Sequence, residues 1–265
     1  MTVTVCMIGG LGNQMFEYAC GRALALRLGA DLQLETSNVD ADPIRDYALG
    51  HFQGIKCPLV KEPQGRMIEY WGMDYHPELF DGIEGDVTLR GYFQSWKWFS
   101  DVDAQIRKDL TLRSIELSRE AVKMSYKCGT PNTVAVHVRM GDYKSDATKA
   151  VMGMLPPSYY EEAIELIQQA EKTKMRCFIF SDEIDETVRY LEIKPHKNIT
   201  LVRGMSEIED LWLMACCRHM ILANSSFSWF GAWANMRGGI KIAPKNWFAN
   251  GQSSEDMCPP NWIRI

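Results

Sequence analysis

Residues 134–143 read Val-Ala-Val-His-Val-Arg-Met-Gly-Asp-Tyr, an apolar run that closes on polar residues and a glycine. Such a run is typical of a strand buried on both faces of a parallel sheet. Because side chains alternate along a strand, His137 and Arg139 point to the same face. Burying both costs several kcal/mol unless they are paired. An Arg at a strand end beside Gly141 therefore predicts a clamp for a phosphate or carboxylate, with a structural Arg139–Asp142 ion pair as the alternative.

Downstream of this run, strand and helix patterns alternate as far as Ala243. We predict strands at 176–180, 198–202, 220–223 and 240–243, and helices at 158–172, 184–191, 206–217 and 225–236. Ser158 with Glu161, and Ser206 with Glu209, have the spacing of capping boxes. Five strands with mostly helical connections indicate a parallel sheet, and ligands of such sheets bind at the carboxyl ends of the strands.

Two more of these predicted strands end in polar residues. Ser181 and Asp182 follow one strand, where they either cap the next helix or read a donor group such as a guanine edge or a ribose hydroxyl. Another strand leads into Asn224-Ser225-Ser226-Phe227, which is either a phosphate cradle at a helix N-terminus or a polar cap over an aromatic helix. Three polar strand ends at one edge of a sheet favour a shared anion site.

The N-terminal part predicts a second α/β unit. It reads as a strand at 2–8, a Gly-rich turn at 9–12, a helix at 13–28 closed by Gly29, and a strand at 31–35. Gly10, Gly12 and Glu35 match a dinucleotide motif in part, but Met15 stands at its third glycine. The turn is therefore a nicotinamide site, a site for another ligand, or a plain strand–helix connection.

The middle of the chain is less regular. Residues 36–86 hold four prolines, 87–93 predict a strand, and 103–126 predict a helix. The turn-rich segment 127–133 predicts the domain boundary, with domains at 1–128 and 129–265. The aromatic side chains between these segments either form a face for a sugar or pack in a core; they are Tyr92, Phe93, Trp96, Trp98 and Phe99.

Composition excludes several classes of protein. The chain has 265 residues, 29 Lys and Arg against 34 Asp and Glu, and a net charge of −5, which argues against a general nucleic-acid binder. We expect a cytoplasmic protein, since no transmembrane run and no secretory signal are visible. The 8 cysteines form no C-x-x-C pair and are interpreted as reduced thiols. The D-x-D strings at Asp40 and Asp101 are interpreted as solvated acids, so no metal site is predicted.

Five motifs, in chain order, resemble the bacterial α-1,2-fucosyltransferases of glycosyltransferase family 11. They run over nearly the whole chain and are Gly9-Gly10-Leu11-Gly12-Asn13-Gln14-Met15-Phe16, Gly91-Tyr92-Phe93-Gln94-Ser95, His137-Val138-Arg139-Met140-Gly141-Asp142-Tyr143, Phe180-Ser181-Asp182 and Asn224-Ser225-Ser226-Phe227-Ser228-Trp229. One departure is Met140, which stands where members commonly have a second arginine.

The resemblance implies a GT-B-like fold, with two Rossmann-like halves facing a central cleft. It also implies GDP-β-L-fucose as donor, the 2-hydroxyl of a β-galactoside as acceptor, inversion at the anomeric carbon and no metal. We expect domain 129–265 to bind the donor and domain 1–128 to meet the acceptor.

The resemblance carries Arg139 over as the diphosphate ligand, and Asp142 is the candidate general base. The remaining residues expected to contact the donor are His137, Ser181, Asp182, Asn224, Ser225, Ser226, Phe227, Gly10 and Asn13.

Two other functions stay open on the residues alone. One is an NAD-dependent oxidoreductase that uses the Gly10/Gly12 turn, and the other is a sugar-binding module without catalysis. Peripheral association with a membrane surface also stays open.

Overall fold

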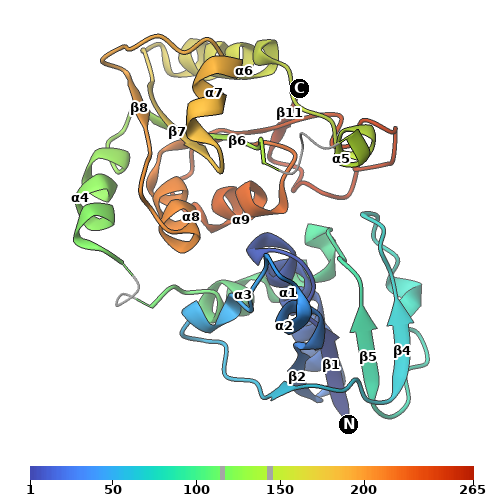
Figure 1. The fold of residues 1–265 in the computed structure, drawn as a ribbon. Helices are drawn as coiled ribbons and strands as arrows, with labels where there is room; N and C mark the ends of the chain where they lie inside the picture. The colour runs from blue at the N-terminus through green and yellow to red at the C-terminus, as the bar shows by residue number, and fades with distance from the viewer. Residues whose placement is uncertain (114–116, 142–145) are drawn as a thin grey trace. The chain divides into compact units, whose positions relative to one another are not determined.

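The structure is a computed structural model that describes residues 1–113, 117–141 and 146–265. The chain divides into two compact units, each visible in Figure 1 as a sheet with its helices. Unit 1 comprises Met1–Arg113 and Glu255–Pro259, and unit 2 comprises Ser114–Ser254 and Pro260–Ile265. Within the named strands every pairing is parallel, as the alternating sequence pattern predicts.

The sheet of unit 1 has the order β3-β2-β1-β5-β4. Its strands are β1 (Thr2–Cys6), β2 (Asp31–Glu35), β3 (Leu59–Val60), β4 (Arg66–Glu69) and β5 (Val87–Arg90). The prediction of β1, β2 and β5 is confirmed, although β5 ends three residues early. Sequence reasoning missed β3 and β4, because both are short edge strands in a polar segment broken by prolines.

The helices of unit 1 are α1 (Leu11–Leu28), α2 (Ser37–Ala41) and α3 (Asp103–Asp109), with 3-10 turns at Leu49–His51, Pro77–Phe80, Trp96–Trp98 and Ser100–Val102. Helix α1 is buried along most of its length and ends at Gly29, which has φ 60° as predicted. Its first turn follows β1 directly and so lies at the carboxyl end of the central strand.

The sheet of unit 2 has the order β11-β10-β9-β6-β7-β8. Its strands are β6 (Thr133–Val138), β7 (Arg176–Ser181), β8 (Ile199–Leu201), β9 (His219–Ile221), β10 (Lys241–Ala243) and β11 (Ile263–Arg264). The five predicted strands are all present. Sequence reasoning missed β11, a two-residue edge strand. The central strand β6 is buried at every position, as its apolar run predicts.

The helices of unit 2 are α4 (Arg119–Cys128), α5 (Asp146–Val151), α6 (Pro157–Glu171), α7 (Ile184–Tyr190), α8 (Glu207–Cys216) and α9 (Ser226–Ala234). The capping box of Ser206 and Glu209 is confirmed. The predicted box at Ser158 is wrong, because α6 begins at Pro157 and Ser158 is already inside its first turn.

Alternation along β6 decides which of its side chains can reach a ligand. Val134, Val136 and Val138 belong to the core cluster that includes Ala163 and Ile167 of α6. His137 points to the opposite face, where its ring lies 5.5 Å from the ring of Phe227 in α9. Arg139 continues that second face just beyond the strand end.

The predicted helix at 103–126 is wrong as a single element, since α3 and α4 are separate helices. The units also divide after Arg113, upstream of the boundary expected at residue 128. The physical reason is that Glu209 of α8 accepts a hydrogen bond from the Ser118 N–H at 2.7 Å, which fixes the start of α4 to unit 2. None of the helices in the described ranges combines the length and apolarity that a membrane crossing requires.

Candidate active site

The polar residues predicted at strand ends meet at one edge of the unit 2 sheet. Val138 of β6 pairs with Ser181 of β7, and Val136 of β6 pairs with Ile221 of β9. Because the strands are parallel and in this register, their carboxyl ends lie in one row (Figure 1). We call the segments that follow β6, β7 and β9 the carboxyl edge of unit 2.

Arg139 is fixed at this edge by an acid from the neighbouring strand. Its Nη1 lies 2.7 Å from Oδ2 of Asp182, and both side chains are largely covered. The other carboxylate oxygen of Asp182 accepts the Met140 N–H at 3.0 Å. Asp182 therefore holds the guanidinium and its backbone in place. Asp142, the predicted partner and candidate base, lies outside the described residues.

Gly141 makes this arrangement possible. A Cβ atom at position 141 would lie 2.4 Å from Oδ2 of Asp182, well inside van der Waals contact. A glycine is needed here because the carboxylate packs directly against the backbone, which explains its position two residues after Arg139.

His137 is a neutral histidine with an unused ring nitrogen. It is 3% exposed, and within the described part of the chain its Nδ1 has no hydrogen-bond partner. Burial, reinforced by the charge of Arg139, lowers the pKa of His137 to about 3. An uncharged imidazole beside Phe227 can therefore give or accept one hydrogen bond from a ligand.

The start of α9 has the features of an anion cradle. Ser225 is the N-cap residue, and its hydroxyl makes no capping hydrogen bond. Ser226 and Phe227 are partly exposed in the first turn, whose N–H groups lack intrahelical acceptors. Ser228 has a different role, because its hydroxyl donates to the carbonyls of Ala223 and Ser225 inside the turn.

Two residues that the sequence predicted as ligand contacts, Asn224 and Ser181, have structural roles at this edge. The amide of Asn224 donates to the carbonyls of Met152, Gly153 and Trp247, at 2.7, 3.2 and 3.1 Å. The hydroxyl of Ser181 accepts from Thr187 Oγ1 at 2.8 Å and from the Glu183 N–H at 3.1 Å, so it joins the turn before α7 to that helix. Both side chains stabilise the loops at this edge, and their polar atoms are engaged within the protein.

Asp210 is a candidate that sequence reasoning missed. Met214 of α8 packs on Gly231 of α9, since a Cβ at Gly231 would lie 3.3 Å from the Met214 Cβ. Asp210 lies one turn before Met214 in α8, the helix that packs on α9. Burial, with Glu209 and Glu207 nearby, raises the pKa of Asp210 to about 7, and its Oδ1 has no partner among the described residues. The sequence did carry a signal for Asp210, because an acidic residue on the inward face of an amphipathic helix is unusual.

In unit 1 the glycine turn at residues 9–12 is stabilised by a side chain of α1. Gly9 has φ +72°, and Gln14 donates to the carbonyls of Gly9 and Asp46, both at 2.8 Å. Asn13 Oδ1 accepts from Gln94 Nε2 at 2.7 Å, which joins the turn to the segment after β5.

A buried acid lies below this turn. Oε2 of Glu17 accepts the Ile8 N–H at 2.9 Å, while its Oε1 has no partner among the described residues. Burial raises the pKa of Glu17 well above its ordinary value.

The predicted aromatic face is only partly available to a ligand. Phe93, Trp98 and Phe99 are fully buried in the core of unit 1. Tyr92 and Trp96 keep partial exposure, and Tyr92 packs edge-on against Trp71 with ring centroids 5.2 Å apart. Trp71 was not predicted, yet it is 43% exposed just beyond β4.

Acidic residues of the D-x-D strings are engaged within the protein. Asp40 pairs with Lys61, Asp101 with Arg27, and Asp103 with Arg107. In the ranges 1–113, 117–141 and 146–265, no three His, Cys, Asp or Glu side chains gather as metal ligands. The cysteines there are free thiols.

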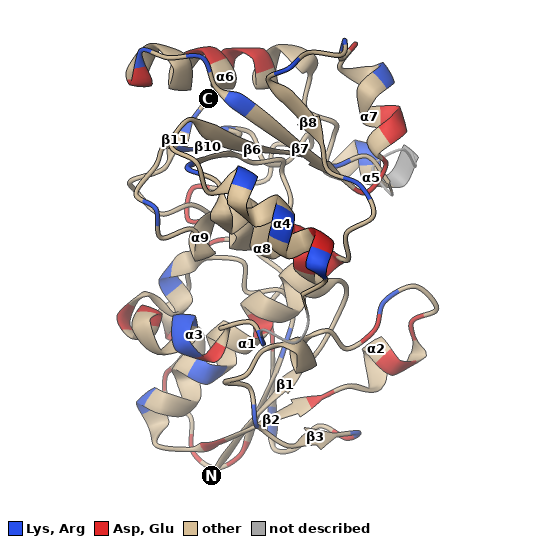
Figure 2. Cartoon of the chain, turned by 90° about the vertical axis from the view of Figure 1, so that its left-hand side faces the viewer, with Lys and Arg blue, Asp and Glu red and all other residues tan. Residues whose placement is uncertain are grey.

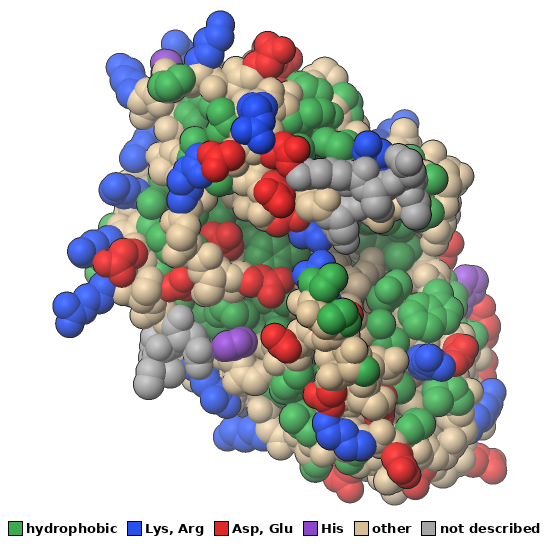
Figure 3. Space-filling view, viewed as in Figure 1, with side chains coloured by type: hydrophobic (Ala, Val, Ile, Leu, Met, Phe, Trp, Pro, Cys, Tyr) green, Lys and Arg blue, Asp and Glu red, His purple; other side chains and the backbone are tan. Residues whose placement is uncertain are grey.

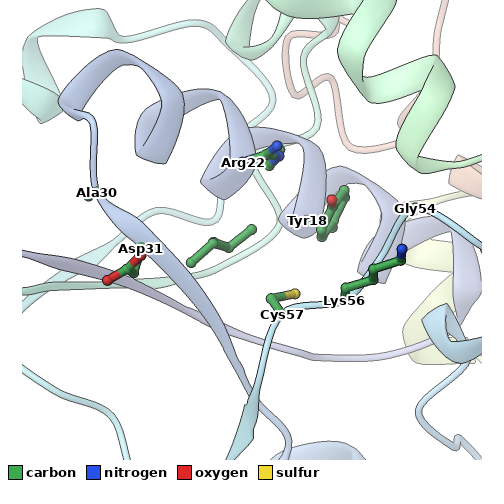
Figure 4. Close-up of a pocket in the computed structure, with 8 residues that line it drawn as sticks. Tyr18, Arg22, Ala30, Asp31, Gly54, Lys56 and Cys57 are labelled. Atoms are coloured by element: carbon green, nitrogen blue, oxygen red, sulfur yellow. The ribbon is translucent and has the colours of Figure 1, made fainter.

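A cavity of about 240 Å³ lies in unit 1 between α1, β2 and the segment before β3. Figure 4 shows Tyr18 and Arg22 of α1 above Lys56 and Cys57. Tyr18 and Arg22 both bind the carboxylate of Asp109, at 3.0 and 3.1 Å. None of the predicted site residues lines this cavity.

Comparisons with known proteins agree on one family. A family model described as glycosyl transferase family 11 matches residues 1–265. An α-1,2-colitosyltransferase of Escherichia coli is 29% identical over 100% of this chain and 99% of its own. The O-antigen biosynthesis glycosyltransferase WbnK of Escherichia coli is 27% identical, over 98% and 99% of the two chains. Galactoside α-(1,2)-fucosyltransferase 2 of Bos taurus is 27% identical, over 99% and 78%.

Solved structures show the same fold. The NodZ α-1,6-fucosyltransferase soaked with GDP-fucose superposes with a TM-score of 0.56 at 13% identity, over 88% of this chain and 92% of its own. The two parallel α/β sheets thus form a GT-B-like fold, which confirms the fold expected from the sequence.

Proposed function

The chain belongs to glycosyl transferase family 11, and from this premise we propose that it transfers L-fucose from GDP-β-L-fucose to the 2-hydroxyl of a β-galactoside. The acceptor oxygen attacks the anomeric carbon as the bond to the phosphate oxygen breaks, and the electron pair leaves with GDP. A single displacement converts the β-linked donor into an α-linked product, so the reaction inverts. The relatives named for α-1,2 transfer and for galactosides support the linkage and the acceptor.

The observation that carries the proposal is the fixed guanidinium at the carboxyl edge of unit 2. Asp182 and Gly141 hold Arg139 in one position, on the face of β6 that α9 covers. Negative charge grows on the β-phosphate as GDP leaves, and donors already in place there stabilise that charge without reorganising. Arg139 and the first turn of α9 supply such donors. We propose that they do so without a metal.

Two groups on the elements that contact α9, His137 in β6 and Asp210 in α8, suit the nucleoside. His137 offers a neutral ring nitrogen, and Asp210 offers a carboxylate oxygen that no other described residue binds. A carboxylate reads the two adjacent N–H donors of a guanine edge, and a neutral imidazole reads a ribose hydroxyl or a ring nitrogen. We assign guanine to Asp210, in place of Asp182, because the carboxylate of Asp182 already binds Arg139 and Met140.

We assign the acceptor to unit 1. The glycine turn, the Asn13–Gln94 pair and the exposed ring of Trp71 all follow strands at the carboxyl end of that sheet. Sugars bind through hydrogen-bonding side chains combined with the face of an aromatic ring. Asp142 remains the proposed base for the proton of the 2-hydroxyl.

Colitosyl transfer is the second candidate, because the E. coli relative at 29% identity is named for colitose. Family membership disfavours both a nicotinamide oxidoreductase and a sugar-binding module without catalysis.

The test is a mass-spectrometric assay of transfer. Purified protein is incubated with GDP-fucose and a panel of β-galactosides, with and without EDTA, and the product linkage is then determined. We expect a fucosylated product with an α-1,2 linkage at an EDTA-independent rate. Transfer to another hydroxyl, or dependence on added Mn²⁺ or Mg²⁺, would refute the linkage or the metal-free mechanism. A product formed only from a colitosyl donor would favour the second candidate.

A further inference from the structure

Positive charge gathers at the amino ends of the unit 2 strands, opposite the carboxyl edge. Each of the five segments that lead into β6, β7, β8, β9 and β10 contributes to it. These cations, which we call the basic edge, are Lys127, Lys172, Lys174, Arg176, Lys194, Lys197, Arg218 and Arg237.

Hydrogen bonds between these segments make the basic edge continuous. Arg237 donates to the Gly129 carbonyl at 2.7 Å, and Arg218 donates to the Arg237 carbonyl. Arg176 donates to the Thr130 hydroxyl at 3.4 Å, and Asn132 reaches the carbonyl of Lys174. Figure 3 shows Lys and Arg side chains along the left margin of the upper part of the molecule.

Acids near the basic edge, such as Glu171 beside His219, are fewer than its cations. In the part of the chain that the structure describes, none of its members forms an ion pair with a carboxylate. Its five lysines also make no side-chain hydrogen bond there. Helix C-termini favour nearby cations, and the carbonyl bound by Arg237 belongs to Gly129, the C-cap residue of α4. The five lysines are exposed, and helix C-termini do not explain their position.

Exposed apolar side chains stand among these cations. Tyr126, next to Lys127, is 76% exposed, and Met236, next to Arg237, is 75% exposed. The Arg237–Gly129 hydrogen bond joins the two segments that carry them. Helix α4, which faces the viewer in Figure 2, carries two further exposed side chains, Val122 and Lys123.

We propose that the basic edge, with Tyr126 and Met236, docks unit 2 onto the surface of an anionic lipid bilayer. Unpaired lysines are attracted to anionic headgroups, and an aromatic ring among them enters the interface. The apolar side chains among the cations favour lipid over a nucleic-acid duplex, whose backbone is bound chiefly through charge. Docking through the amino edge leaves the carboxyl edge, with Arg139, open to a dissolved nucleotide sugar. This inference does not depend on the proposed function.

The test is co-sedimentation with vesicles of phosphatidylcholine alone, or with about one third phosphatidylglycerol. We expect the protein to bind only the anionic vesicles and to be released by high salt. The triple variant Lys127→Gln/Lys172→Gln/Lys174→Gln is expected to lose on the order of a hundredfold in affinity. A matched control, Lys56→Gln/Arg66→Gln/Lys108→Gln, removes the same charge from exposed cations of unit 1 and is expected to bind like wild type.

Transfer to a soluble acceptor without vesicles should be unchanged in both triple variants, so failure of docking is separable from failure of catalysis. Tyr126→Ala should weaken vesicle binding severalfold, because the ring no longer enters the interface. Absence of binding to anionic vesicles, equal loss in both triple variants, or an unchanged affinity in Tyr126→Ala would each overturn the proposal. So would tighter binding of a duplex oligonucleotide to the same edge.

Discussion

At the scale of single residues, the site depends on pairs that the sequence shows only in part. Arg139 was predicted as an anion ligand because a charged residue at the end of a buried strand needs a partner. That partner is Asp182, which is 43 positions away along the chain. The pairing follows from the register of β6 against β7, which local sequence does not reveal. The role of Asn224 was missed for the same reason, because its partners are loop carbonyls distant in sequence.

Asp182 is therefore expected to act through Arg139. Asp182→Asn removes the charge that orients the guanidinium and should lower both GDP affinity and kcat/KM about tenfold. Gly141→Ala should have a similar effect, since its Cβ would displace the carboxylate. The check is a double-mutant cycle: in an Arg139→Ala background, Asp182→Asn should cost little more. Full additivity of the two losses would contradict a positioning role.

The pKa of Asp210, raised to about 7, predicts a pH dependence of GDP binding. If guanine N–H groups donate to this carboxylate, only its ionised form binds well. Below pH 7 the proton must first be lost, so GDP affinity should fall up to tenfold per pH unit and reach a plateau above pH 7. Calorimetry between pH 5.5 and 8.5 measures this profile. Asp210→Asn should bind weakly at every pH with no such slope, and a slope that survived this substitution would assign the titration to another group.

At the scale of elements, the sequence predicted the strands and helices that have a clear hydrophobic period or a clear cap. The central strands and α1, α6, α7, α8 and α9 have long apolar patterns, and all were found. The short edge strands β3, β4 and β11 lack such a pattern, because two to four residues define no period. The break between α3 and α4 was missed because both halves favour helix locally, whereas α4 is placed by its contact with α8.

The side chain of Glu209 takes part in two contacts, one at the start of α8 and one at the start of α4. Its carboxylate accepts the Ser206 N–H within the capping box and the Ser118 N–H at the start of α4. Ser206→Ala should lower the free energy of unfolding by about 1 kcal/mol, the usual value for a lost N-cap. Glu209→Ala should cost more, about 2 kcal/mol, because two backbone N–H donors lose a charged acceptor. Urea denaturation measures both values, and equal losses would show that the contact with α4 adds no stability.

At the scale of the whole molecule, the two units are assigned to different substrates. Unit 2 carries the groups assigned to GDP, and unit 1 carries those assigned to the galactoside. Trp71→Ala should therefore raise the acceptor KM about tenfold and change the ranking of acceptors, because a stacking ring is lost. GDP affinity should stay within about twofold of wild type, whereas Ser226→Pro should weaken GDP binding and leave the acceptor ranking intact. Calorimetry and acceptor kinetics on both variants decide this, and reversed effects would exchange the two assignments.

The central claim is that the donor binds at the carboxyl edge of unit 2, around Arg139. Titration calorimetry of GDP against wild type, Arg139→Ala and Arg139→Lys tests it most directly, with circular dichroism to confirm folding. Arg139→Ala should bind GDP on the order of a hundredfold more weakly, and Arg139→Lys should recover little of that loss, because a lysine lacks the planar fork of donors. The control variant Arg66→Gln, an exposed cation of unit 1, should bind GDP like wild type. A folded Arg139→Ala protein with wild-type affinity for GDP would place the donor elsewhere.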